Sequence, residues 1–153
     1  MSLESHLTSQ VVLPGSALNL YVSKVKNFTF TPGLDHILEL ELKSIFNQHN
    51  LLSEFEYLAD INLISFVSAA SHNSGGLTSL NATYYQHSFI VQAEYQIEDL
   101  RVNNKLVSKQ VAQAEFKYNS RLERLEQREI VDGYNQAVKL LAKKIIMQIN
   151  QKF

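Results

Sequence analysis

Apolar residues recur along the chain with two different periods, and these periods limit the folds open to it. Between residues 84 and 97 the apolar side chains occupy alternate positions, which is the pattern of a strand with one buried face. At 34–46 and 130–149 the spacing is three and four residues, which is the pattern of a helix with one buried face. A chain that carries both periods predicts a sheet covered by helices.

The local patterns predict six elements. In chain order they are a strand at about 17–25, a helix from Leu34 to about Asn47, strands at about 54–69, 84–97 and 105–118, and a helix over about 130–149. Asn103 and Asn104 predict a hairpin turn between the last two strands, because asparagine accepts positive φ angles. The stretch 71–83 is rich in polar residues and contains two glycines, so we expect a long loop there.

The order β-α-β-β-β-α predicts an α+β fold. We expect a two-layer sandwich, with two helices packed on one face of a mostly antiparallel four-stranded sheet. Residues 17–153 are expected to form this single domain. The tail 1–16 is expected to be an expression remnant or a linker behind a lipid anchor. An apolar content of 45% with 19% charged residues favours a compact fold over disorder.

The residue types that carry most enzyme chemistry are missing or scattered. The chain has no cysteine, which excludes disulfides, thiolate zinc sites and cysteine nucleophiles. Its five histidines form no metal-ligand motif, and no glycine-rich phosphate loop or serine elbow is present. We therefore expect a binding protein rather than an enzyme, with no catalytic residue, metal or cofactor. The opening residues do not read as a signal peptide, and no apolar run is long enough to span a bilayer.

Several segments, taken in order, resemble the LptE-like family of lipopolysaccharide-assembly lipoproteins. They are His6-Leu7, Val12-Leu13-Pro14-Gly15, the strand from Leu18 to Val22, the stretch from Val25 to Asp35, Ala59-Asp60-Ile61-Asn62-Leu63, and the closing helix with Ile130, Tyr134, Ala137, Leu141 and Lys144. The resemblance spans about residues 6–150.

The resemblance implies a protein held at the periplasmic face of the outer membrane by an N-terminal lipid that this chain does not include. It also implies that the protein plugs an LptD-type β-barrel, assists its assembly and contacts lipopolysaccharide. Three cations near the expected hairpin, Arg101, Lys105 and Lys109, are our candidates for contact with lipopolysaccharide phosphates. Reversing Arg101 and Lys105 to glutamate should then weaken binding without lowering the melting temperature. Ordinary solvated side chains of a turn are the alternative.

Two other functions fit parts of the pattern. One is an auxiliary lipoprotein of an ABC-type envelope lipid transport system, whose final helix is similar. The other is a double-stranded-RNA-binding domain, which shares the order α-β-β-β-α and carries lysines on its last helix. Lys143 and Lys144 lie more than two turns inside the expected helix, and the net charge is −1. We therefore expect no nucleic-acid partner.

Overall fold

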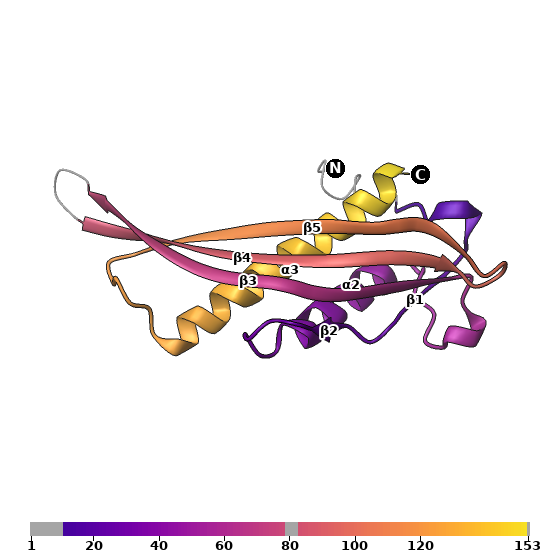
Figure 1. Cartoon of the computed structure of the whole chain (residues 1–153), viewed down its shortest axis with the longest axis horizontal. Helices are drawn as coiled ribbons and strands as arrows, with labels where there is room; N and C mark the ends of the chain where they lie inside the picture. Colours follow the sequence, from indigo (N-terminus) through magenta and orange to yellow (C-terminus); the bar gives the residue numbers. More distant parts are fainter. Residues whose placement is uncertain (1–10, 79–82, 153) are drawn as a thin grey trace.

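Three long strands and two helices account for most of the fold (Figure 1). The computed structural model describes residues 11–78 and 83–152. The elements in chain order are the short 3₁₀ helix η1 (Pro14–Ser16), β1 (Leu20–Val22), β2 (Lys26–Asn27), α2 (Leu34–Gln48), the 3₁₀ helix η2 (Glu56–Leu58), β3 (Ile61–Thr78), β4 (Thr83–Asp99), β5 (Asn104–Ser120) and α3 (Gln127–Lys152). None of the helices in the described part of the chain is long and apolar enough to cross a membrane.

The sheet has five strands and is mixed, which corrects the expected four-stranded and mostly antiparallel sheet. β3, β4 and β5 form an antiparallel meander, whereas β1 and β2 both pair with β3 in parallel. The strand expected over 17–25 is shorter than predicted: β1 covers only Leu20–Val22, and β2 begins beyond the expected range, at Lys26. Between them the amide of Val25 donates to Glu39 of α2, at 2.8 Å, instead of to the sheet. α2 then carries the chain back along the sheet, so the strand that follows it runs parallel to those before it.

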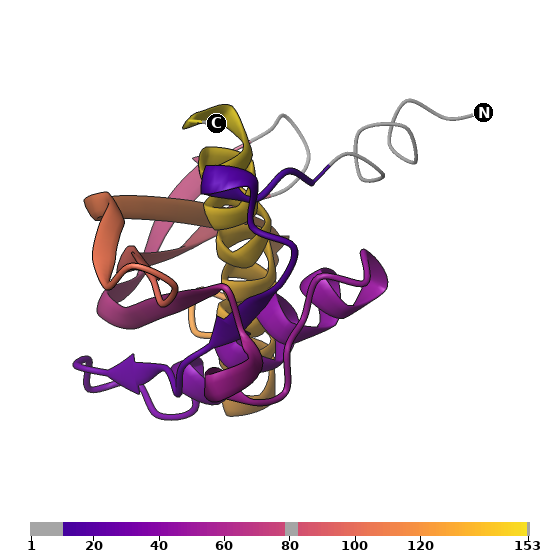
Figure 2. The same cartoon turned by 90° about the vertical axis from the view of Figure 1, so that its right-hand side faces the viewer.

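Both helices cover the same face of the sheet, as expected (Figures 1 and 2). α2 begins after Gly33, which has a φ of 85°, and Asn50 follows its end with a φ of 58°. The buried stripe of α2 consists of Leu34, Leu38, Leu42 and Phe46. That of α3 consists of Tyr134, Ala137, Val138, Leu141, Ala142, Ile145, Ile146 and Ile149. The helix periods read from the sequence are therefore confirmed.

The core lies between the helices and the inner face of the sheet. The alternating apolar residues of β4 that face the helices are fully or almost fully buried: Phe89, Val91, Ala93, Tyr95 and Ile97. The hydroxyl of Tyr95 donates to Gln148 Oε1 of α3 at 2.8 Å. Burial raises the pKa of Tyr95 to about 12, so this buried phenol stays neutral. Residues 11–16 also lie against the domain, since Leu13 and Pro14 are buried and the amide of Val12 donates to Asn150 of α3.

The polar stretch expected to be a loop over 71–83 is instead largely strand. β3 continues to Thr78, and its register with β4 runs without interruption from Ser71, opposite Ile90, to Thr78, opposite Thr83. Residues 79–82, in the remainder of the expected loop, lie outside the described residues. In Figure 1 the β3–β4 hairpin reaches beyond the helices. Cross-strand pairing with β4 therefore overrides the turn tendency of serine, asparagine and glycine.

Candidate functional site: surfaces at the two ends of the sheet

Arg101, one of the three cations singled out from the sequence, is fixed within the β4–β5 turn. Asn103 has a φ of 56°, which confirms the hairpin. The guanidinium of Arg101 donates from Nε and Nη2 to the two carboxylate oxygens of Asp99, at 3.0 and 3.1 Å, and from Nη2 to the carbonyl of Gly15, at 3.0 Å. These hydrogen bonds lower the pKa of the Asp99 carboxyl. Arg101 thus ties the hairpin to η1, and reversing its charge would disturb the fold as well as any ligand contact.

The other two cations lie along β5, at its start and on its outer face. The side chain of Lys105 is exposed and has no ion pair with the described residues. Lys109 Nζ lies 3.1 Å from Glu94 Oε1 and 5.5 Å from the centre of the Phe66 ring. Of the three cations, Lys105 alone makes no ion pair among the residues that the structure describes, although it lies opposite Glu98 in the register of β4 and β5. The side chain of Lys109 is more than half exposed, so its ammonium group can leave Glu94 and bind a phosphate instead.

Neither helix covers the outer face of the sheet (Figure 2). This face carries polar side chains and ion pairs of both signs. Lys117 pairs with Glu115 at 3.7 Å, and Glu115 also accepts a hydrogen bond from Ser88. Gln92 donates to Ser68 at 3.1 Å. Such a face offers donors and acceptors to a polar partner but has no concentrated charge.

Large apolar side chains are exposed at the end of the sheet where the β4–β5 hairpin lies. We call this set the hairpin-end surface: Leu18, Phe55, Tyr57, Leu58 and Val102, with exposed fractions between 51% and 80%. Hydrogen bonds hold these segments together, since the amide of Leu18 donates to Asp60 and the side chain of Asn19 donates to the carbonyl of Leu58. Of this set, Tyr57 also lines an open hollow of about 440 Å³, together with Glu56, Ala59 and Leu100. A set of this kind is typical of a protein-binding surface.

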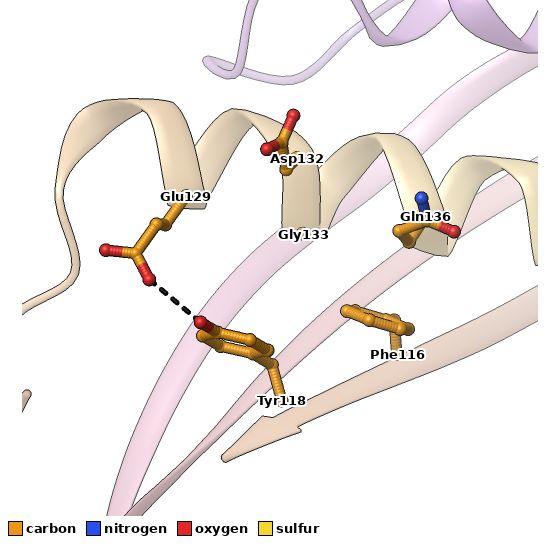
Figure 3. A pocket seen from close by; sticks show the side chains of 6 residues that line it. All are labelled: Phe116, Tyr118, Glu129, Asp132, Gly133 and Gln136. Atoms are coloured by element: carbon orange, nitrogen blue, oxygen red, sulfur yellow. Dashed lines mark hydrogen bonds between the residues drawn. The ribbon is translucent and has the colours of Figure 1, made fainter. Parts of the chain in front are cut away.

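A second hollow lies between β5 and the first turns of α3 (Figure 3). Its lining consists of Phe116, Tyr118, Glu129, Asp132, Gly133 and Gln136, and its volume is about 150 Å³. The hydroxyl of Tyr118 donates to Glu129 Oε2 at 3.0 Å, and this hydrogen bond raises the pKa of Tyr118. Pockets that bind small ligands have volumes of roughly 300–1,000 Å³. This hollow suits a few water molecules.

A pair of histidines that the sequence reasoning missed lies under the start of α3. His72 Nε2 lies 2.9 Å from His87 Nδ1, and His87 Nε2 lies 2.9 Å from the carbonyl of Leu122. His87 is fully buried, and the His72 ring stacks on Phe89 with centroids 4.4 Å apart. A carbonyl can only accept, so His87 Nε2 donates and the neutral pair has His72 Nε2–H donating to His87. Burial, and secondly the charge of His87, lower the pKa of His72.

One signal in the sequence could have found His87. His87 lies two residues from both Tyr85 and Phe89, so in an alternating strand its side chain lies on the same face as theirs, which is the face toward the core. Its partner could not be found in this way, because His72 was assigned to a loop. Three of the four ring nitrogens take part in these hydrogen bonds, and His72 Nδ1 is the fourth. The described residues contain no group of three or more histidine, cysteine, aspartate or glutamate side chains that could hold a metal ion.

Comparisons with known proteins identify the fold. No family model matches the chain, and no curated protein matches it in sequence. Solved structures do match. A minor lipoprotein from Acinetobacter baumannii is 20% identical with a TM-score of 0.54, over 88% of this chain and 94% of that one. Protein XCC0632 from Xanthomonas campestris is 10% identical with a TM-score of 0.57, over 88% of both chains.

A third match is the PelC dodecamer from Paraburkholderia phytofirmans. Its chain is 12% identical with a TM-score of 0.54, over 90% of this chain and 92% of that one. At these identities the likeness concerns architecture, and fold alone does not assign a function. The chain therefore has an α+β fold that is also found in bacterial lipoproteins.

Proposed function

We propose that this chain is an LptE-like lipoprotein, which binds and plugs an LptD-type outer-membrane β-barrel and assists its assembly and the export of lipopolysaccharide. In this proposal the protein is not an enzyme. It is lipid-anchored at the periplasmic face of the outer membrane through a residue that precedes this chain. The resemblance of the ordered segments between residues 6 and 150 supports it. A fold shared with a bacterial lipoprotein agrees with it.

The observation that carries the proposal is the hairpin-end surface. It places exposed apolar side chains, such as Tyr57 and Leu58, at one end of a long sheet, where Tyr57 also lines an open hollow. A plug needs such an end to contact the inner wall of a barrel. It also needs a polar body that tolerates a wet lumen, and the outer face of the sheet has that character.

Lipopolysaccharide contact is assigned to Lys105, with Lys109 beside it on the same strand. Lys105 is exposed at the hairpin and unpaired within the described residues, so it can reach a phosphate without breaking an internal ion pair. Arg101 is given a supporting role, since it holds the hairpin to η1 through Gly15.

Co-purification tests the proposal. The tagged full-length lipoprotein should retain the LptD-type barrel of the same cell through detergent extraction and affinity purification. A variant with Tyr57→Asp and Leu58→Asp should retain at least tenfold less barrel, because two charges would enter an apolar contact. The matched control is Val131→Asp with Met147→Asp, which places two charges at exposed apolar positions of α3.

The wild-type result separates this proposal from its nearest alternative. Recovery of an inner-membrane lipid transporter in place of the barrel would favour the auxiliary lipoprotein of an ABC-type system. Equal recovery of the barrel by wild type and by the Tyr57/Leu58 variant would mean that the barrel is the partner but that the hairpin-end surface does not contact it.

A further inference from the structure

Lysine and phenylalanine alternate with less exposed residues in the segment that joins β1 to α2. Lys24, Lys26, Phe28 and Phe30 occupy every second position and are all exposed; we call them the 24–30 row. Between them, Val25 is buried with 2% of its surface accessible. From Ser5 to Leu34 the sequence contains no acidic residue, and its only lysines or arginines are Lys24 and Lys26.

The two phenylalanines extend an aromatic strip from the sheet out to a loop tip. The ring of Phe28 meets the ring of Phe66 edge-on, with centroids 5.0 Å apart, and its amide donates to Val67 of β3. Phe28 is 65% exposed, and Phe30 is fully exposed at 107%. Full exposure of so large an apolar side chain is unfavourable unless something else covers it.

The loop that carries Phe30 is held by its own side chains. Asn27 Oδ1 accepts from the amide and the hydroxyl of Thr29, at 3.0 and 2.7 Å, and Asn27 Nδ2 donates to the carbonyl of Thr31 at 2.8 Å. The amide of Thr31 donates to the hydroxyl of Thr29 at 3.2 Å. A loop fixed in this way presents Phe30 with little conformational entropy left to lose on binding.

The cations of the row are free to meet a negative partner. Lys24 and Lys26 make no ion pair with any residue that the structure describes, in contrast to Lys43, Lys109 and Lys117. The parallel register places Lys26 beside Phe66 of β3, so its side chain shares the outer face with the aromatic strip. The row thus joins uncompensated positive charge to protruding aromatic rings.

We propose that the 24–30 row docks on an anionic lipid bilayer, with Phe30 and Phe28 inserted at the interface and Lys24 and Lys26 against the phosphate headgroups. Protruding aromatic side chains flanked by cations match the apolar and anionic layers of such a surface. The two phenylalanines of the row are 65% and 107% exposed, so they suit insertion into a lipid layer rather than enclosure of a single lipid molecule. This inference does not depend on the barrel partner.

Vesicle sedimentation tests it on the whole chain. The wild-type protein should pellet with vesicles of phosphatidylcholine and phosphatidylglycerol in equal parts, and not with phosphatidylcholine alone. Phe30→Ala should weaken partitioning about tenfold, since a full phenylalanine side chain leaves the lipid. Replacing Lys24 and Lys26 by glutamine should weaken it about fivefold for each charge removed.

The controls lie on α3, away from the row. Lys143→Gln with Lys144→Gln removes two exposed charges, and Met147→Ala removes an exposed apolar side chain; both should pellet as the wild type does. Thermal unfolding should give the same midpoint for Phe30→Ala as for the wild type, because Phe30 is fully exposed. Wild-type protein that stays in the supernatant with the anionic vesicles would overturn the inference, as would an unchanged partition of Phe30→Ala.

A tryptophan at the loop tip gives an independent readout. The chain contains no tryptophan, so Phe30→Trp introduces a single fluorophore. Its emission should shift to shorter wavelength when phosphatidylglycerol vesicles are added, and high salt should reverse the shift by screening the lysines. An emission spectrum that does not change with these vesicles would contradict insertion. A shift that needs a protein partner in place of lipid would contradict it equally.

Discussion

Gly133 of α3 lies directly against the ring of Phe89 of β4. A Cβ atom added to Gly133 would stand 2.4 Å from two carbons of that ring. The same ring meets Tyr134 edge-on, with centroids 5.2 Å apart, and stacks on His72. This close approach therefore brings the start of α3 onto the histidine pair.

Gly133→Ala should lower the free energy of unfolding by about 1–3 kcal/mol, because the new methyl group overlaps an enclosed ring. This range is the net loss: the clash itself costs more, because the gain in helix propensity, about 1 kcal/mol, opposes it. Urea denaturation checks it, with Gly75→Ala, which has open space around it, as the control. In a Phe89→Leu background the loss caused by Gly133→Ala should shrink. An equal loss in both backgrounds would mean that the ring is not the cause.

His72 should make stability depend on pH. The pKa of His72 is lowered from 6.5 in the folded protein, so the folded state binds fewer protons than the unfolded state. Its contribution is fully present above the unfolded pKa of about 6.5. It is lost as the pH falls from there towards the folded value. Urea midpoints measured at pH 7.5 and at lower pH should fall with acidification. The fall should be smaller in His72→Gln than in the exposed control His36→Gln.

Arg101→Ala should lower the melting temperature by a few degrees, since it removes the hydrogen bonds to Asp99 and Gly15. The Asp99 carboxyl has a lowered pKa, so its stabilising effect is present above the unfolded pKa of about 3.9 and is lost as the pH falls further. Acid denaturation of Arg101→Ala should show a weaker pH dependence below this value. A melting temperature equal to that of the wild type would refute the structural role of Arg101.

Lys105→Glu should weaken binding of purified lipopolysaccharide about fivefold, which is the upper range for one exposed charge contact. The melting temperature should not change, because Lys105 has no ion pair among the described residues. Titration of both proteins at low and high salt measures the effect. Lys139→Glu, at an exposed position of α3, is the matched control. Equal affinities for wild type and Lys105→Glu would remove the hairpin from the binding surface.

The sequence predicted those elements whose pattern is local. α2, α3 and β4 carry long periodic stripes, and the Asn103 turn follows from the φ angles that asparagine accepts. The end of β3 could not be predicted, because the strand over 71–78 is stabilised by pairing with β4 and not by its own polar residues. That omission also concealed the histidine pair, since His72 and His87 meet only when the hairpin extends past them.

The candidate site shows the same division. Lys105 was found because it flanks a recognisable turn, and the structure leaves it exposed. The role of Arg101 was not visible, because Gly15 lies 86 residues away in the chain. The hairpin-end surface depends on hydrogen bonds from Leu18 to Asp60 and from Asn19 to Leu58, which join distant segments and which no local pattern encodes.

Photo-crosslinking in living cells tests the central claim most directly. A photoreactive amino acid would replace Tyr57, which is 80% exposed in the hairpin-end surface, and a second variant would carry it at Met147 on α3. The account predicts an adduct between the Tyr57 variant and the LptD-type barrel, and a much weaker one or none from Met147. A Tyr57 variant that crosslinks to other proteins and never to the barrel would contradict it.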